Sequence, residues 1–416
     1  MVELLHSEGF VSLEVQYIDG TKIESASNKY TFVWRGSIEK YDTRLREKTR
    51  MILSEAEQVL EMESHETQPH KELSVEEFQT RTSRIKEKMV HAEVPKKIRK
   101  AVEKAEKESI PKMLEYEHAL EIMGERNSYS KTDEDATFMR MKEDAMKNGQ
   151  LKPGYNIQIA TENQFITNYA IYHRPTDTLT LIPFLESFEK RYGRQSKVVV
   201  ADSGYGSEQN YEYLFGCNII PYIKYNMFHQ EQKRRYKKNA FLVQNLFYNR
   251  QGNYYVCPMG QHLSFIREEK RKSDAGYISQ VGIYRAAKCV GCPVRGICNK
   301  AMGNRKIEVN HTLNKYKEKI RYLLNSEEGI FHRKKRPVEP EAVFADIKEA
   351  GKFRRFRLRG VTGAGIEFGL KAVAHNIKKM AVRIAKRDLF HGKTQKTLNY
   401  PQIQLKITYE RNIMAA

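Results

Sequence analysis

The sequence lacks the features that mark membrane and secreted proteins. None of its apolar runs approaches the roughly 20 residues that a membrane-spanning helix requires. Its first 20 residues, MVELLHSEGFVSLEVQYIDG, carry acidic side chains where a signal peptide has a basic and then an apolar segment. Five cysteines among 416 residues do not make a disulfide framework. We therefore expect a soluble intracellular protein with no membrane partner.

Acidic residues are also scarce relative to basic ones. The chain has 72 Lys and Arg against 52 Asp and Glu, a formal net charge of +20. The excess is local, because residues 41–130 contain 17 basic and 19 acidic residues whereas residues 331–416 contain 20 basic and 7 acidic residues. Lys and Arg bind nucleic acids by displacing counterions from phosphates. The sequence therefore predicts a nucleic-acid partner that contacts the C-terminal part.

The periodicity of apolar residues predicts an α/β domain. Alternating or continuous apolar patterns indicate strands over residues 11–18, 155–161, 165–173, 197–202 and 218–225, with helices between the later ones. This order is that of the ribonuclease H-like fold, a mixed sheet flanked by helices. Between the first two strands, residues 37–130 are rich in Glu, Lys, Leu and Ala at helical spacing. We expect this segment to be a helical insertion, folded as a helical hairpin.

Three acids are the candidate catalytic residues. Asp19 and Asp202 are expected to end the first and fourth strands, and Glu341 follows Pro340, a favourable first position of a helix. Lys348 shares one face of that helix with Glu341. Converging carboxylates are the oxygen ligands that Mg²⁺ prefers, and two such ions support in-line attack at phosphorus. Glu339 is the alternative third acid, and Asp177 is interpreted as a solvated cap or turn residue.

Long motifs around these acids resemble a known family. The segment DGTKIESASNKYTFVW begins at Asp19, ADSGYGSEQN begins at Ala201, and RPVEPEAVF begins at Arg336. All three are similar to the catalytic segments of IS-four-like DDE transposases of bacterial insertion sequences. The similarity is greatest to the subgroup with a helical insertion after the first Asp and a Cys-containing insertion before the Glu.

The resemblance implies a function and a set of partners. Asp19, Asp202 and Glu341 would hold two Mg²⁺ ions, which Mn²⁺ could replace, and the protein would cut transposon ends and join them to target DNA. Lys348 would contact phosphate, and Arg336 lies near the position of a basic residue in the family, one residue further from the Glu. A homodimer on double-stranded DNA, in the cytoplasm and at the nucleoid of a bacterium, is implied as well.

Cysteines cluster in the second expected insertion. Cys257, Cys289, Cys292 and Cys298 have the spacing C-x31-C-x2-C-x5-C, and four thiolates could close a tetrahedral zinc site. Four reduced thiols are the alternative. We expect this insertion to be rich in loops and to have little core of its own.

A run of basic and aromatic residues follows the candidate helix. Phe353 and Phe356 alternate there with four arginines that we expect to bind DNA, namely Arg354, Arg355, Arg357 and Arg359. Such runs could grip phosphates while the rings stack on unpaired bases.

The domain boundaries follow from these patterns. The catalytic domain is expected to comprise residues 1–36, 150–226 and 331–390, interrupted by insertions at 37–149 and 227–330 and followed by a tail at 391–416. Relatives carry a helical end-recognition region before the first Asp, whereas 18 residues precede Asp19 here. A truncated remnant that only binds DNA is therefore one alternative function, and a host nuclease of the same fold is another.

Overall fold

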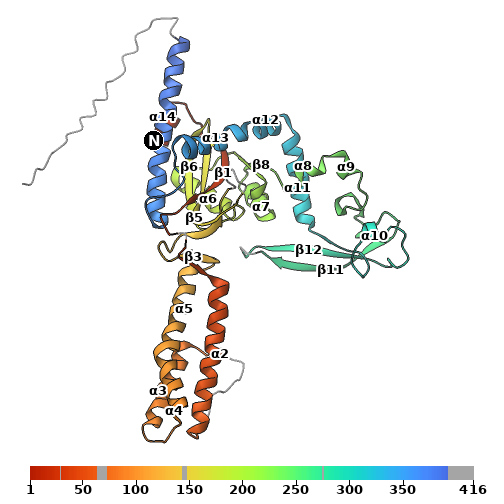
Figure 1. The fold of residues 1–416 in the computed structure, drawn as a ribbon. Coiled ribbons are helices and arrows are strands. Elements are labelled where there is room, and N and C mark those ends of the chain that lie inside the picture. The colour runs from red at the N-terminus through yellow and green to blue at the C-terminus, as the bar shows by residue number, and fades with distance from the viewer. Residues whose placement is uncertain (29, 63–72, 143–147, 274–275, 392–416) are drawn as a thin grey trace, which may run out of the picture.

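The computed structural model describes residues 1–28, 30–62, 73–142, 148–273 and 276–391. A six-stranded sheet lies at its centre, with the order β4-β5-β1-β7-β8 and with β6 also paired to β5. Its strands are β1 (Val15–Glu24), β4 (Thr137–Arg140), β5 (Leu151–Glu162), β6 (Phe165–Tyr172), β7 (Val198–Ala201) and β8 (Ile220–Ile223). Helices flank this sheet (Figure 1).

The pairing of the central sheet is mixed. β1 runs antiparallel to β5 and parallel to β7, and β7 runs parallel to β8. β5 and β6 form an antiparallel hairpin whose turn residues, Asn163 and Gln164, have φ angles of 54° and 66°. The expected mixed sheet flanked by helices is confirmed, and its strand order is compatible with the ribonuclease H-like fold.

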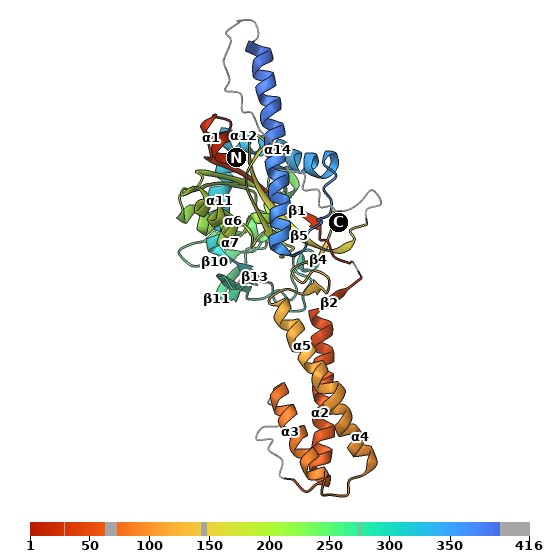
Figure 2. The same cartoon turned by 90° about the vertical axis from the view of Figure 1, so that its left-hand side faces the viewer.

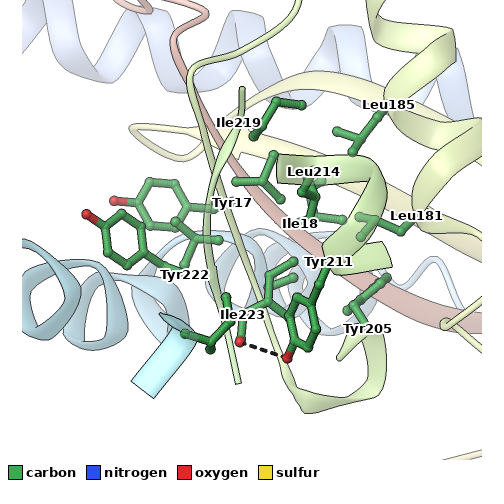
Figure 3. Close-up of a cluster of buried hydrophobic side chains, with 14 of the residues drawn as sticks. Tyr17, Ile18, Leu181, Leu185, Tyr205, Tyr211, Leu214, Ile219, Tyr222 and Ile223 are labelled. Carbon is green, nitrogen blue, oxygen red and sulfur yellow. Dashed lines mark hydrogen bonds between the residues drawn. The ribbon is translucent and has the colours of Figure 1, made fainter. Parts of the chain in front are cut away.

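One face of the sheet is covered by α6 (Leu181–Tyr192) and α7 (Glu208–Gly216). Their apolar side chains join those of β1, β7 and β8 in a single buried cluster, part of which is drawn in Figure 3. Each helix has a local signal that bounds it: α6 ends at Gly193 with a left-handed φ of 66°, and the Ser207 side chain caps the start of α7. These two helices fix β7, which leads directly to Asp202.

The C-terminal helices cover the opposite face. They are α13 (Pro340–Ala345), the π-helical segment η5 (Asp346–Ala350) and α14 (Gly360–His391). Val343, Phe344 and Ile347 from the first two join Phe368 from α14 and Ile157 from β5 in a second buried cluster. This packing holds the start of α13, and with it Glu341, beside β1.

The first strand lies further along the chain than the predicted 11–18: it begins at Val15 and is longer. β1 continues to Glu24, so Asp19 lies inside it, opposite Ile159 of β5, and the expectation that this acid ends the strand is wrong. Gly20 does not break the strand because β5 pairs with it throughout. The parallel pairing with β7 stops at Tyr17 and Val200, however. Asp19 therefore lies beyond the last β1–β7 pair, at the C-terminal end of β7, where no described strand pairs with β1 on that side.

The helices after β1 form a long arm that projects away from the sheet (Figure 1). It contains α2 (Arg35–Val59), α3 (Val75–Met89), α4 (Lys96–Lys104), the π-helical segment η1 (Ala105–Ser109) and α5 (Ile110–Met123). A capping box at Ser74 and Glu77 starts α3. The arm has its own buried cluster, which includes Leu53, Phe78 and Val102. It is thus more than the expected hairpin, because α3 packs against both long segments. β2 (Phe32–Trp34) and β3 (Ser128–Ser130) pair at its base.

The Cys-containing region builds a separate antiparallel sheet with the order β13-β12-β11-β10-β9. Its strands are β9 (Phe247–Asn249), β10 (Tyr254–Val256), β11 (His262–Lys272), β12 (Ile278–Ala286) and β13 (Lys306–Val309). Leu263, Tyr284 and Ile307 are buried in a cluster of their own. The expectation of a loop-rich segment with little core is therefore wrong: cross-strand aromatic pairs, such as Tyr248 with Tyr255, contribute to the core.

Two helices lead from this second sheet back to the first. α11 (His311–Asn325) places Ile320 and Leu324 in the cluster beneath α6 and α7, and α12 (Glu327–Lys335) leads through the 3₁₀ turn η4 (Arg336–Val338) into α13. The remaining short elements are α1 (Val2–Ser7), η2 (Ser203–Tyr205), α8 (Phe228–Glu231), α9 (Arg234–Lys237), η3 (Val243–Asn245) and α10 (Arg295–Cys298). Among the described residues, no helix combines the length and the apolar character needed to cross a membrane.

Candidate active site

Three segments far apart in the sequence bring the predicted acids together. Asp19 projects from β1, Asp202 directly follows β7, and Glu341 lies in the first turn of α13. The Asp202 carboxylate accepts a hydrogen bond of 2.7 Å from the Gly204 backbone N–H, which holds it at the start of η2. Pro340 begins α13, as the sequence predicted.

The guanidinium of Arg336 lies among the three carboxylates. Its Nη2 atom is 3.1 Å from Asp19 Oδ1 and 3.7 Å from Asp202 Oδ2, and its Nη1 atom is 2.8 Å from Glu341 Oε1. The side chain of Arg336 is 10% exposed, that of Asp19 is 16% exposed, and those of Asp202 and Glu341 are 41% and 51% exposed. One buried cation therefore joins three acids that would otherwise repel one another.

Asp19 has the most perturbed environment of the three. The pKa of Asp19 is raised to about 6, chiefly by burial: the charges of Asp202 and Glu341 also raise it, whereas Arg336 and the Gly20 N–H lower it. A carboxyl group with a raised pKa in a cluster of acids is common at functional sites. An additional cation near Asp19 would therefore reduce the repulsion among the three carboxylates.

A fourth acid lies close to the other three. Asp177 Oδ1 accepts hydrogen bonds from Asn156 Nδ2 (2.7 Å) and Gln158 Nε2 (2.8 Å), and Gln158 accepts one from the Tyr205 hydroxyl. A Cβ atom on Gly20 would clash with Gln158 Nε2 and lie 2.6 Å from Asp177 Oδ1, so a larger residue next to Asp19 would displace these two side chains. The interpretation of Asp177 as a merely solvated residue missed these contacts, which depend on β5 lying beside β1.

Lys348 lies on the same side of β1 as Asp19. Its ammonium group donates hydrogen bonds to the Thr21 hydroxyl and to the Lys22 carbonyl oxygen (3.2 Å). Burial, followed by the charge of Lys142, lowers its pKa to about 8. The predicted face shared by Glu341 and Lys348 is thus turned toward β1, although α13 passes into a π-helical segment between them.

The alternative third acid has a different place. Glu339 is buried, and its Oε2 atom accepts hydrogen bonds from the Gln164 backbone N–H (2.7 Å) and the Thr161 hydroxyl (3.3 Å). Through these bonds the Glu339 carboxylate holds the turn before α13 against the β5–β6 hairpin. Glu341, by contrast, is half exposed and points to Arg336, so it is the better placed of the two.

The basic run after η5 is divided between structural and free side chains. Arg355 donates to the carbonyl oxygens of Ser25 and Ser27, and Arg354 pairs with Glu349. Arg357 and Arg359 are exposed and form no ion pair within the described residues. The idea that the intervening rings stack on bases is wrong, because Phe353 and Phe356 are buried against the sheet and are only 5% and 2% exposed.

The four clustered cysteines line one small cavity of about 20 Å³. Backbone N–H groups of Gln261 and Arg305 lie 3.3 Å from the sulfurs of Cys257 and Cys289, and Arg305 Nη1 lies 3.1 Å from the sulfur of Cys298. Such N–H contacts suit thiolates better than thiols, because the sulfur accepts. Cys217 lies apart and is exposed.

Neither candidate metal site is fully assembled. Across the described part of the chain, no three His, Cys, Asp or Glu side chains stand close enough together to hold a metal ion. At the acidic cluster the guanidinium of Arg336 lies between the carboxylates instead. Because Asp202 and Glu341 are partly exposed, both can rotate toward Asp19 without disturbing the core.

Comparison with known proteins gives one match. Residues 256–381 match the family model described as a transposase DDE domain. This range includes the four clustered cysteines, Arg336, Glu341 and Lys348, but neither Asp19 nor Asp202. No curated protein and no solved structure matches the chain. The match supports a DDE transposase, and hence an enzyme that acts on DNA.

The buried position of Phe356 predicts a large effect on stability. Phe356→Ala should lower the free energy of unfolding by about 3–5 kcal/mol, because it leaves a cavity between the sheet and α14. Leu358→Ala, at a side chain that is 47% exposed, should change it by less than about 0.5 kcal/mol. Urea denaturation of both variants measures the difference. Equal stability of the two variants would restore the base-stacking interpretation.

The raised pKa of Asp19 predicts a stability that depends on pH. The folded protein binds this proton up to about pH 6, whereas an unfolded chain releases it near 3.8, so folding loses stability as pH rises through this window. Asp19→Asn, which stays neutral, should be more stable than the parent by roughly 2–3 kcal/mol at pH 7.5 and nearly equal to it at pH 4. Urea denaturation in chelator at both pH values measures this.

A control of opposite sign lies on η5. Hydrogen bonds from Lys378 and His375 outweigh burial and lower the pKa of Asp346, so Asp346→Asn should be less stable than the parent at pH 7.5. A destabilised Asp19→Asn protein at that pH would show that the pairing with Arg336 outweighs burial.

Proposed function

We propose that the chain is a DDE transposase of an insertion sequence, similar to the IS-four-like group, with a ribonuclease H-like core. The observation that carries this proposal is the convergence of Asp19, Asp202 and Glu341 on one guanidinium at the open edge of the sheet. Carboxylates from two adjacent strands and a helix can act together only where the fold brings them to one point.

The donor set fits Mg²⁺, and Mn²⁺ would fit as well, because all three ligands offer hard oxygen atoms. The Arg336 guanidinium already lies among the three carboxylates, which supports the proposal that a cation can be held at this point. Bound Mg²⁺ would polarise the phosphate and lower the pKa of the attacking water. Asp19 is fixed by β1, whereas Asp202 and Glu341 have room to adjust.

The proposed reaction has two steps, a hydrolysis and a transesterification, and each is a displacement at phosphorus. In the first, water attacks a phosphodiester at the transposon end, and the bond to the 3′ oxygen breaks to leave a 3′-OH and a 5′-phosphate. In the second, that 3′-OH attacks a phosphodiester of target DNA and expels a new 3′ oxygen. The number of phosphodiester bonds is unchanged in the second step, and no covalent bond to the protein forms.

The basic side chains around the acids have separate tasks in this proposal. Arg336 offsets part of the negative charge of the cluster and can turn one N–H toward phosphate when the acids gain another cation. Lys348 keeps one ammonium N–H free of its two bonds to β1, and the exposed Arg357 and Arg359 would bind the DNA backbone. Arg354 would do so after leaving Glu349, while Arg355 holds the segment against β1.

The test is DNA cleavage by acid variants. In Mg²⁺, the parent should nick a plasmid that carries the DNA flanking its gene, and Asp202→Asn or Glu341→Gln should reduce the rate by at least about 100-fold. Glu318→Gln, at an exposed acid of α11 outside this cluster, should stay within about twofold. Undiminished cleavage by the first two variants would refute the triad. A parent that binds this plasmid but never cuts it would favour the DNA-binding remnant.

We further propose that the four clustered cysteines hold one structural zinc ion. They line one cavity, and their sulfurs receive N–H contacts of the kind that stabilise thiolates. Purified protein should contain about one zinc per chain, and Cys289→Ser should lose it, whereas Cys217→Ser, at the isolated cysteine, should retain it. Metal analysis and thermal unfolding with and without chelator measure both effects. Zinc that survives Cys289→Ser would exclude this cluster.

A further inference from the structure

A chain of hydrogen-bonded side chains connects Asp177 to the turn that carries Asp202. Gln158 donates from Nε2 to Asp177 Oδ1 at 2.8 Å, and its Oε1 atom accepts a hydrogen bond from the Tyr205 hydroxyl. Gln158 and Tyr205 are both fully buried. Tyr205 ends η2, which begins directly after Asp202. Asp177 is therefore linked to the Asp202 turn through two buried side chains.

The course of this chain depends on Gly20. Figure 2 shows β1 and β5 side by side, and Gly20 is the partner of Gln158 in their register. Asn156 and Gln158 alternate with Ile157 along β5, so their side chains leave the same face of the sheet. A Cβ atom on Gly20 would clash with Gln158 Nε2. Because position 20 is a glycine, the amides of β5 can reach Asp177 in the loop before α6.

The charge of Asp177 fixes the direction of the hydrogen bonds in the chain. An ionised carboxylate only accepts, so the NH2 groups of Asn156 and Gln158 both turn toward it. Gln158 then presents its oxygen to Tyr205, whose hydroxyl donates. A buried hydroxyl without a partner costs free energy. Tyr205, and with it the end of η2, is consequently held in this one arrangement.

Further contacts tie the Asp177 loop to the same turn. The Thr178 hydroxyl donates to the Gly204 carbonyl oxygen at 2.7 Å, and Asn210 Nδ2 donates to the Thr178 carbonyl oxygen at 2.9 Å. A Cβ atom on Gly204 would lie 3.0 Å from Asp202 Oδ1 and 3.9 Å from Asp177 Oδ2. The loop that carries Asp177 thus lies directly against the turn that carries Asp202.

We propose that Asp177 is a positioning residue: through Gln158 and Tyr205 it sets the conformation of the turn after β7, and so the direction of the Asp202 carboxylate. Asp202 is 41% exposed, and its contact with Arg336 is the longest that this guanidinium makes to the three acids. Its direction therefore depends on the turn in which it lies. The inference rests on the proposed function, in which Asp202 helps to hold the catalytic cation, and Asp177 acts through Asp202.

Plasmid nicking in Mg²⁺ tests this role. Asp177→Ala and Tyr205→Phe should each lower the nicking rate by about 10- to 100-fold, the usual cost of removing a group that orients a metal ligand. The double variant should be no slower than the slower single variant, because both changes break the same chain. Asp177→Asn should stay within about threefold of the parent, because its side-chain oxygen can accept both bonds that now reach Oδ1.

Tyr211→Phe is the matched control. Tyr211 is as buried as Tyr205 and lies in the same apolar cluster (Figure 3), but its hydroxyl donates to the Ile223 carbonyl oxygen at 3.2 Å. Both Tyr→Phe variants should unfold at similar temperatures, and only Tyr205→Phe should nick slowly. Equal rates for the two would overturn the positioning role. Asp177→Asn as slow as Asp177→Ala would overturn it too, because the carboxylate charge itself would then be what the site needs.

Hydrogen exchange measures the turn without DNA. In Asp177→Ala and Tyr205→Phe, the backbone amides of residues 203–206 should exchange at least about tenfold faster than in the parent, whereas Tyr211→Phe should leave them unchanged. Unchanged exchange in the first two variants would contradict the inference. A parent that never nicks the plasmid would refute the proposed function, and the exchange rates alone would then decide whether Asp177 holds this turn.

Discussion

Repulsion among carboxylates gathered at one sheet edge is the constraint on which the rest of this structure depends. Asp19 is nearly buried and cannot retreat into water, so a positive charge must accompany it. Arg336 supplies that charge and contacts all three acids from a 3₁₀ turn. One guanidinium thereby ties together β1, the loop after β7 and α13. The 3₁₀ turn η4 between α12 and α13 places Arg336 at this point.

The turn between β5 and β6 holds the segment that carries Arg336 in position. The Gln164 backbone N–H donates to Glu339, and its carbonyl oxygen lies 3.0 Å from His375 Nε2 on α14. Its side-chain oxygen accepts from Lys379. A single residue with a φ of 66° thus links the segment that carries Arg336 to the helix that covers the sheet. Glu339 has a structural task here, which explains an acid so close to Glu341.

Local signals in the sequence predicted the elements, and the structure alone revealed their contacts. Pro340, the apolar run before Asp202 and the polar turn at Asn163 each act within a few residues, so strands and helices were placed well. Asp19 was misplaced at a strand end because Asp-Gly usually marks a turn, and pairing to β5 overrode that preference. Phe353 and Phe356 were predicted to contact DNA because their burial cannot be read from local sequence. It depends on packing against β5 and α14, which are distant in the sequence.

The distal part of helix α14 has few tertiary contacts to stabilise it. Residues 381–387 are all exposed, yet the helix continues through them. Isolated helical turns are marginal in water, and most helices depend on tertiary packing. Up to Lys379 the inner face supplies that packing, whereas beyond it Met380 against the N-terminal cluster and Arg387 over Phe10 are the contacts present. The N-terminal cluster that contains Phe10 therefore holds the distal part of α14 against its own domain.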